Sequence, residues 1–148
     1  MSDHTQAASW LQRCIEQRVA RFGTADASAR PHQVPICFVL LGERLYSVID
    51  DKPKPTRTRL RRLRNIRENP AVSVLVDHYE DDWSGLWFVT MTGTAALVSD
   101  REEFERALQA LRAKYPQYAA MALSWETHPM IVVHIANVHG WSAMPSSP

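Results

Sequence analysis

The chain contains little of what several large classes of protein require. Its longest uninterrupted apolar run is six residues, far short of the roughly 20 that a membrane-spanning helix needs. The N-terminus has no basic stretch followed by an apolar one, which argues against a secretory signal. Two cysteines, Cys14 and Cys37, are too few for a disulfide framework or a four-cysteine zinc site. We therefore expect a reduced, cytoplasmic protein with no membrane association.

Glycine is also scarce, with five residues, and none forms a Gly-x-Gly-x-x-Gly loop. Phosphate-loop, nucleophile-elbow and His-Glu-x-x-His motifs are missing as well, so no protein nucleophile is indicated and no catalytic residue is assigned. His78 lies near three aspartates and could bind a hard cation. A solvated turn is the simpler interpretation, and we assign no metal.

What the chain does have suits one globular domain. Its 148 residues are 45% hydrophobic and 22% charged, a balance that supports a packed core rather than a disordered chain. No internal repeat or linker divides it. We expect a single domain over residues 1–148, with its core over about 9–142.

The hydrophobic periodicity predicts a β-rich α+β fold. Six antiparallel strands are expected at 20–25, 32–41, 45–49, 72–76, 86–98 and 130–135. Three helices are expected: 9–21, a second that Thr56 or Thr58 caps and Asn69-Pro70 ends, and a third that begins at a capping box at 99–102. Pro35 should place its strand at a sheet edge, and Gly93 suggests a bulge. Short connections favour an antiparallel sheet or small barrel.

Basic residues are concentrated in one segment. Eight of the seventeen lysines and arginines lie between positions 52 and 67, a stretch without any acidic residue. The segment could bind the phosphate of a cofactor at the start of a helix, or it could follow the phosphates of a nucleic acid. It could also be a solvated helix face. The net charge of +1 argues against a protein that mainly coats nucleic acid.

Four tryptophans, Trp83, Trp87, Trp125 and Trp141, lie in the second half of the chain. Core packing is the simpler interpretation for each one. As a group they could also form the wall of a site for a flat aromatic ligand.

The order of several short segments is similar to that of one known family. The segments are Pro31-His32-Gln33-Val34-Pro35, Asp51-Lys52-Pro53-Lys54, residues 60–66 with Asn69-Pro70, Leu75-Val76-Asp77-His78-Tyr79, Asp82-Trp83, Gly93-Thr94-Ala95, residues 114–118 and Gly140-Trp141. Together they resemble the pyridoxamine 5'-phosphate oxidase-like (PPOX class) split-barrel family, and within it the probable coenzyme F-420 (deazaflavin) dependent oxidoreductases. The resemblance covers about residues 18–141.

The resemblance implies a split β-barrel of the FMN-binding type that forms a homodimer, with cofactor grooves at the subunit interface. It implies that the strand with Val34, Pro35 and Ile36 lies along the cofactor ring. The phosphate contacts that it implies are Lys54, Arg62 and Asn65, with Lys52 and Arg57 beside them.

The expected activity is F-420-dependent hydride transfer to or from a small conjugated organic substrate, without a nucleic-acid partner. His32, His78 or Tyr79 could supply a proton to the substrate. FMN is the alternative cofactor, and a non-catalytic module that binds a flavin or tetrapyrrole is the alternative in another class.

Overall fold

The computed structural model describes residues 3–50 and 60–144. Its seven strands are β1 (Ala20–Ala25), β2 (Pro31–Ile36), β3 (Val39–Leu41), β4 (Arg44–Val48), β5 (Ala71–His78), β6 (Trp87–Leu97) and β7 (Met130–Ser142). The helices of the described residues are α1 (Asp3–Cys14), α2 (Arg61–Glu68), α3 (Arg101–Lys114) and α4 (Pro116–Ala119), and η2 (Trp83–Gly85) is a 3₁₀ turn. All strand pairs are antiparallel.

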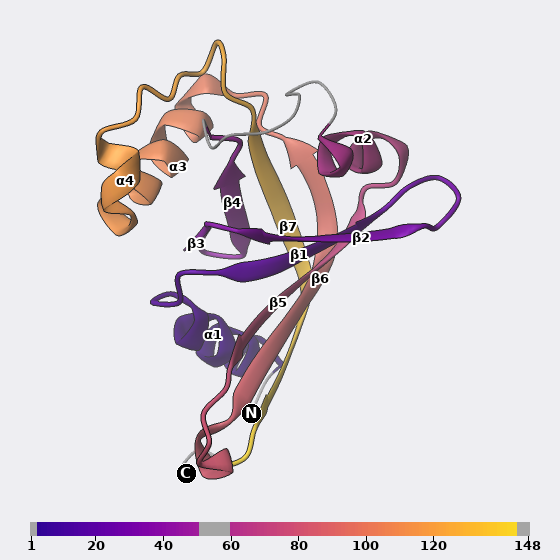
Figure 1. Cartoon of the computed structure of the whole chain (residues 1–148), viewed down its shortest axis with the longest axis vertical. Helices are drawn as coiled ribbons and strands as arrows, with labels where there is room; N and C mark the ends of the chain where they lie inside the picture. Colours follow the sequence, from indigo (N-terminus) through magenta and orange to yellow (C-terminus); the bar gives the residue numbers. More distant parts are fainter. Residues whose placement is uncertain (1–2, 51–59, 145–148) are drawn as a thin grey trace.

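The sheet has the order β2-β1-β5-β6-β7-β4-β3 and curls into a half-barrel. Strands β5, β6 and β7 form a long meander, and the hairpins β1–β2 and β3–β4 extend it on either side. Figure 1 shows β1 and β2 crossing the long strands, with α2 near one end of the curl and α3 and α4 over the β3–β4 side. This is the expected split β-barrel, with seven strands instead of about six.

Two clusters of buried side chains stabilise the curl. One lies between α1, α2 and strands β1, β5 and β6, with Phe22, Val74 and Met91 among its members. The other lies under α3 and α4, where Phe104, Leu108 and Leu111 form the expected helical stripe. Burial of this kind contributes roughly 25 cal/mol per Å² of apolar surface, so both clusters matter for stability.

The single strand expected over 32–41 is wrong, because the structure divides it into β2 and β3 at opposite edges of the sheet. The break occurs at Phe38, whose backbone bonds to side chains instead of a neighbouring strand. Its N–H donates to Tyr115 Oη (2.9 Å), and its carbonyl accepts from Lys114 Nζ (2.9 Å). Pro35 does lie on an edge strand, β2, as expected.

The expected first helix is also displaced. Helix α1 ends at Cys14, and residues expected on its later turns belong to a turn and to β1. Phe22 lies in β1, because β1 pairs with both β2 and β5 and the two ladders satisfy its backbone. Helix α2 has Leu60 at its N-cap without a side-chain bond, and Thr56 and Thr58 lie outside the described residues.

The bulge expected at Gly93 is confirmed, whereas the cap expected for α3 is displaced by one residue. Helix α3 begins where it was expected, but Asp100 rather than Ser99 caps it, by accepting a hydrogen bond from the Glu103 N–H (3.1 Å). The β6–β7 register shifts between Thr92 and Gly93, where a Cβ would collide with the backbone carbonyl of His134. Gly93 is therefore required by the close approach of β7.

Candidate functional site

A cluster of buried and half-buried polar side chains lies where α2 packs on the β1–β2 hairpin. We call Thr24, His32, Arg62 and Asn65 the α2 cluster. Asn65 is 1% exposed, and its amide nitrogen donates to Thr24 Oγ1 (2.9 Å). His32 is the ladder partner of Thr24.

Three atoms of this cluster have no hydrogen-bond partner among the described residues. They are His32 Nδ1, Arg62 Nε and Asn65 Oδ1. No other buried side-chain nitrogen or oxygen of the described residues lacks a hydrogen-bond partner. Because buried polar groups are nearly always paired, three orphaned atoms in one place indicate a site that binds a polar ligand.

The sequence of α2 explains this placement. Leu63 and Ile66 pack on the core, which buries Asn65 beside Ile66 and leaves Arg61, Arg64 and Arg67 exposed. Arg62 lies at the flank of the apolar stripe and is half-buried. Arg62 and Asn65 are thus one helical turn apart, and the Asn65 amide reaches Thr24 of β1.

The electrostatics of the α2 cluster favour an anion. Burial lowers the pKa of Arg62, and the nearby Asp50 and Tyr118 act in the opposite direction. Burial, and then the charges of Arg61 and Arg62, lower the pKa of His32. An anion at this point would stabilise the positive charge of Arg62, which burial disfavours. It would also offset the repulsion between Arg62 and a protonated His32.

A hollow of about 410 Å³ lies next to the α2 cluster, between α2 and the β1–β2 turn. Its two carboxylates are already engaged: Asp26 accepts from Arg30 Nε (2.8 Å), and Glu68 accepts from the Ala27 N–H (3.1 Å). Arg61 and Arg64 also line the hollow and have no ion pair with any described residue. The basic character of α2 therefore extends past Arg62.

An open groove of about 900 Å³ crosses the outward face of the sheet next to the α2 cluster, and Thr24 and His32 contribute to its lining. One ladder row across it consists of Gln33, Gly23, Ser73, Thr92 and Asn137. At Gly23 a Cβ would lie 2.8 Å from Ser73 Oγ. Gly23 and Ser73, which are neighbours in this row, have small side chains and leave the backbone between them accessible to a flat ligand.

The structure brings together only some of the expected site residues. Arg62 and Asn65 lie in the α2 cluster, whereas Lys52, Lys54 and Arg57 lie outside the described residues.

The residues expected along the cofactor ring lie on β2. Pro35 is exposed and Val34 is partly buried, while Ile36 is 6% exposed and belongs to the core. The side chain of Ile36 therefore cannot face a ligand, and only the strand backbone there could.

Three contributors were not expected: Thr24, Arg61 and Arg64. The basic run in the sequence pointed to the arginines as a group, but nothing local distinguished those that line the hollow. Thr24 gave no signal, because its role depends on Asn65, 41 positions away.

Other candidates do not form a second site of this kind. His78 bonds to Glu80 (3.0 Å) and stacks on Trp87, and the described residues contain no group of three potential metal ligands. Trp125 packs edge-on against Phe104, while Trp141 stacks on Phe88. Trp125 thus lies under α3, apart from Trp83, Trp87 and Trp141, which lie at the β5–β6 hairpin end of the sheet.

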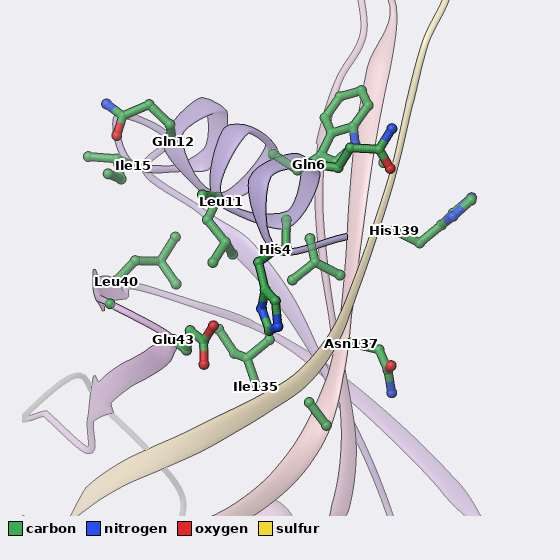
Figure 2. Close-up of a pocket in the computed structure, with 17 residues that line it drawn as sticks. His4, Gln6, Leu11, Gln12, Ile15, Leu40, Glu43, Ile135, Asn137 and His139 are labelled. Atoms are coloured by element: carbon green, nitrogen blue, oxygen red, sulfur yellow. The ribbon is translucent and has the colours of Figure 1, made fainter. Parts of the chain in front are cut away.

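A groove of about 830 Å³ runs between α1 and β7. Figure 2 shows His4 pointing into it towards Glu43 and Ile135, and Leu11 and Leu40 also line it. It contains no orphaned buried polar atom and no arginine or lysine. The α2 cluster is the better candidate for an anionic ligand.

None of the helices among the described residues has both the length and the apolar character of a membrane-spanning segment.

The sequence matches the family model described as Pyridoxamine 5'-phosphate oxidase over residues 5–143. The chain belongs to this family. The resemblance stated from the sequence is thereby confirmed at the level of the family. No curated protein matches the chain.

Solved structures agree with the fold of the family. A FAD-binding protein from Mesorhizobium loti is 21% identical with a TM-score of 0.68, and covers 95% of this chain and 94% of its own. A FAD-binding protein from Mycobacterium smegmatis is 17% identical (TM-score 0.60, 90% and 91% covered). A heme storage protein from Vibrio cholerae is 17% identical (TM-score 0.66, 96% and 95% covered). At these identities the likeness establishes the split-barrel fold.

Proposed function

We propose that this protein is an oxidoreductase that binds a phosphate-bearing cofactor of the flavin type, coenzyme F-420 in first place. It would transfer a hydride between that cofactor and a small conjugated organic substrate. Membership of the pyridoxamine 5'-phosphate oxidase family supports the reaction class. The observation that carries the proposal is the set of three orphaned polar atoms in the α2 cluster.

The atoms available there fit the chemistry of such a cofactor. A guanidinium donates to phosphate oxygens, and Arg62 has an unused donor at Nε. Asn65 Oδ1 can only accept, so it suits a hydroxyl of the cofactor's polyol chain rather than its phosphate. The lowered pKa of His32 keeps its imidazole neutral near pH 7, which suits a hydrogen bond to the same chain better than proton delivery.

The sheet groove gives a place for the ring. The small side chains of Gly23 and Ser73 allow a flat ring to lie against the backbone, while Pro35 holds the path of the edge strand beside it. The cofactor, when bound, supplies the hydride chemistry, and the protein supplies position and electrostatics. This division agrees with the absence of a nucleophile motif in the sequence.

F-420 is favoured over FMN by the amount of positive charge. Arg61 and Arg64 extend the basic surface beyond Arg62, and F-420 has an anionic tail beyond its phosphate, whereas FMN ends at a single phosphate. FMN remains the second candidate, because two proteins of the same fold are described as FAD-binding. A direct comparison separates the two cofactors.

The binding experiment is a calorimetric titration of apo protein with F-420 and with FMN at two salt concentrations. We expect tighter binding of F-420, and a loss of about ten- to hundred-fold in Arg62→Ala and Lys54→Ala, the usual cost of a charge-assisted hydrogen bond. Arg67→Ala is the control, because Arg67 is exposed near the end of α2 and should change binding little. Equal losses in all three variants would indicate a diffuse basic surface and refute the phosphate site.

The activity experiment uses the loaded protein. Re-oxidation of the reduced, bound cofactor by a panel of enones and nitro compounds, monitored by absorbance, should be faster than re-oxidation of the free cofactor. Tight binding without any acceleration would instead identify a non-catalytic carrier, a role that the shared fold of the heme storage protein illustrates.

A further inference from the structure

One motif of the sequence, Lys114-Tyr115-Pro116 at the end of α3, has no part in the candidate site. The Lys114 side chain is half-buried, and its Nζ lies 3.8 Å from the centroid of the Phe38 ring and 5.3 Å from that of the Tyr115 ring. It donates a hydrogen bond to the neutral Phe38 carbonyl (2.9 Å). No carboxylate among the described residues forms an ion pair with it. Lys114 is therefore partly removed from water without an anionic partner in the described part of the chain.

A second cation lies beside Lys114. Arg18 donates a hydrogen bond through Nη1 to the Lys114 carbonyl, and its guanidinium carbon lies 5.7 Å from the centroid of the same Tyr115 ring. The aromatic rings attract an ammonium, but they also exclude the water that would solvate it. Desolvation and a neighbouring cation are the two conditions that turn a lysine from an ammonium into a nucleophilic amine.

The titratable groups around Lys114 act in both directions. Burial, and then the charge of Arg18, lower the pKa of Lys114 from 10.5 to about 8, while the smaller effects of Glu16 and the two thiols oppose this shift. At about pH 7.5 a sizeable fraction of the amine is therefore neutral, whereas an ordinary lysine is almost entirely protonated. The groups that face Lys114 from the neighbouring elements are Cys14 at the end of α1, Glu16 and Arg18 after it, Cys37 between β2 and β3, and the Tyr115 hydroxyl.

We propose that Lys114 is a modification site, a nucleophilic amine that takes an acyl group from an acyl phosphate. The neutral Nζ attacks the acyl carbon, and a C–N bond forms while the C–O bond to the phosphate breaks. Inorganic phosphate leaves with the bonding electron pair and accepts the proton that the amine loses. The step needs no oxidant and no metal. It is independent of the proposed function, because no cofactor takes part in it.

Arg18 selects the class of acyl donor. Its side chain is exposed, and it has further N–H groups beyond the one that contacts the Lys114 carbonyl. These groups can contact the phosphate of the donor while the acyl carbon meets Nζ. A dianionic acyl phosphate therefore fits this pair of side chains better than a neutral acyl donor.

The product also fits the surrounding contacts. An acylated Lys114 is an amide that keeps one N–H, so the Phe38 carbonyl can stay paired. The amide is neutral, which removes the repulsion of Arg18 and the cost of burying a charge. The chain has two other lysines, Lys52 and Lys54, so few side-chain amines compete for the donor.

Folding itself provides the first test. The full chain is treated with acetyl phosphate at about pH 7.5, folded or unfolded in guanidinium chloride, and acetylation of Lys114 is followed by peptide mass spectrometry. We expect Lys114 to react at least about tenfold faster in the folded chain, because unfolding returns its pKa to the ordinary value. A rate that is equal or slower in the folded chain would show a structural ammonium and overturn the proposal.

The pH profile provides a second readout. In the folded chain the rate should level off above about pH 8, while in the unfolded chain it should keep rising towards the ordinary lysine value. A folded-state rate that rises through the same range as the unfolded one would contradict a neutral amine. Lys114→Arg keeps a cation and a donor for the Phe38 carbonyl, and should remove this acetylated peptide without a loss of thermal stability.

Arg18→Gln tests the donor class. It should slow acetylation by acetyl phosphate about three- to fivefold more than acetylation by a neutral N-hydroxysuccinimide ester, as expected for one exposed ionic contact. Arg106→Gln removes another exposed arginine of the same region, on α3, and should leave both rates unchanged. If Arg18→Gln slows the two donors equally, Arg18 does not contact the phosphate and the assignment to acyl phosphates is overturned.

Discussion

Two regions of this molecule bury polar side chains to a similar extent, but they satisfy them differently. We call Tyr115, Tyr118, Lys114 and Asp50 the tyrosine cluster, which lies under α3 and α4. There Tyr115 Oη contacts the Phe38 N–H (2.9 Å), the Phe38 carbonyl (3.2 Å) and the Arg18 carbonyl (2.9 Å). Tyr118 Oη donates to Asp50 (2.6 Å). In the α2 cluster, three atoms have no partner among the described residues.

The difference separates a structural role from a binding role. The saturated network around Tyr115 holds the β2–β3 break in place and leaves no polar atom for a ligand. Burial therefore raises the pKa of Tyr115 to about 12 without creating a binding site. An unsaturated network costs stability until a ligand supplies the missing partners. Burial and a shifted pKa occur in both clusters, and only the orphaned atoms distinguish them.

The largest expected effect is on stability, at Tyr115. Tyr115→Phe removes the acceptor of the buried Phe38 N–H, and an unpaired buried group costs about 1–3 kcal/mol. Urea unfolding should show this loss, while the affinity for the cofactor stays close to that of wild type. Tyr79→Phe makes the same chemical change at an exposed position and should alter the free energy of unfolding by less than about 0.5 kcal/mol. An unchanged stability in Tyr115→Phe would mean that the network does not hold the β2–β3 break.

The opposite pattern is expected in the α2 cluster. Thr24→Val combined with Asn65→Leu removes a hydrogen-bonded pair together with an orphaned acceptor, so stability should change by less than about 1 kcal/mol. Cofactor affinity should fall by about tenfold, since Asn65 Oδ1 no longer accepts a hydroxyl. Unfolding and titration on the same preparation check both. A large loss of stability with unchanged affinity would make this cluster structural, like the tyrosine cluster.

A smaller effect is expected at the edge strand. Pro35→Gly loosens the path of β2, because glycine has more freedom in the unfolded chain, at a cost of about 0.4–1 kcal/mol. If the cofactor ring lies along this strand, affinity should fall by more than the change in unfolding free energy predicts. Parallel titrations and thermal melts make the comparison. Unchanged affinity would place the ring elsewhere in the groove.

How much of this could be read from the sequence depended on how local each cause was. Helix α3, strand β5, the bulge at Gly93 and the edge position of Pro35 all follow from residues within a few positions, and they were predicted. The break at Phe38 was not, because its cause is Tyr115, 77 positions away. Alternating apolar residues continue through the break, so periodicity alone predicts one strand.

The candidate site shows the same limit. Arg62 and Asn65 were expected because the order of segments resembled a family, whereas the basic run by itself allowed three interpretations. That Asn65 is buried with an unused oxygen depends on how α2 packs on β1, which no local pattern specifies. The contacts of Lys52, Lys54 and Arg57 remain predictions from the resemblance.

The smallest expected effect concerns protonation of His32. Its pKa lies below the ordinary value of 6.5 because of burial and the neighbouring Arg61 and Arg62. At a pH between the lowered pKa of the folded protein and the value of 6.5 in the unfolded chain, the unfolded chain binds more protons than the folded one. The free energy of unfolding should therefore fall as the pH drops through 6.5. One proton limits the slope to about 1.4 kcal/mol per pH unit. The stability of His32→Gln should depend less on pH in this range, while His139→Gln, at an exposed position on β7, should follow wild type.

Inorganic phosphate that binds beside Arg62 should raise the pKa of His32 and make the wild-type stability depend less on pH. If phosphate flattens wild type and His32→Gln equally, the anion binds away from His32, and the α2 cluster is not where the phosphate of a cofactor lies.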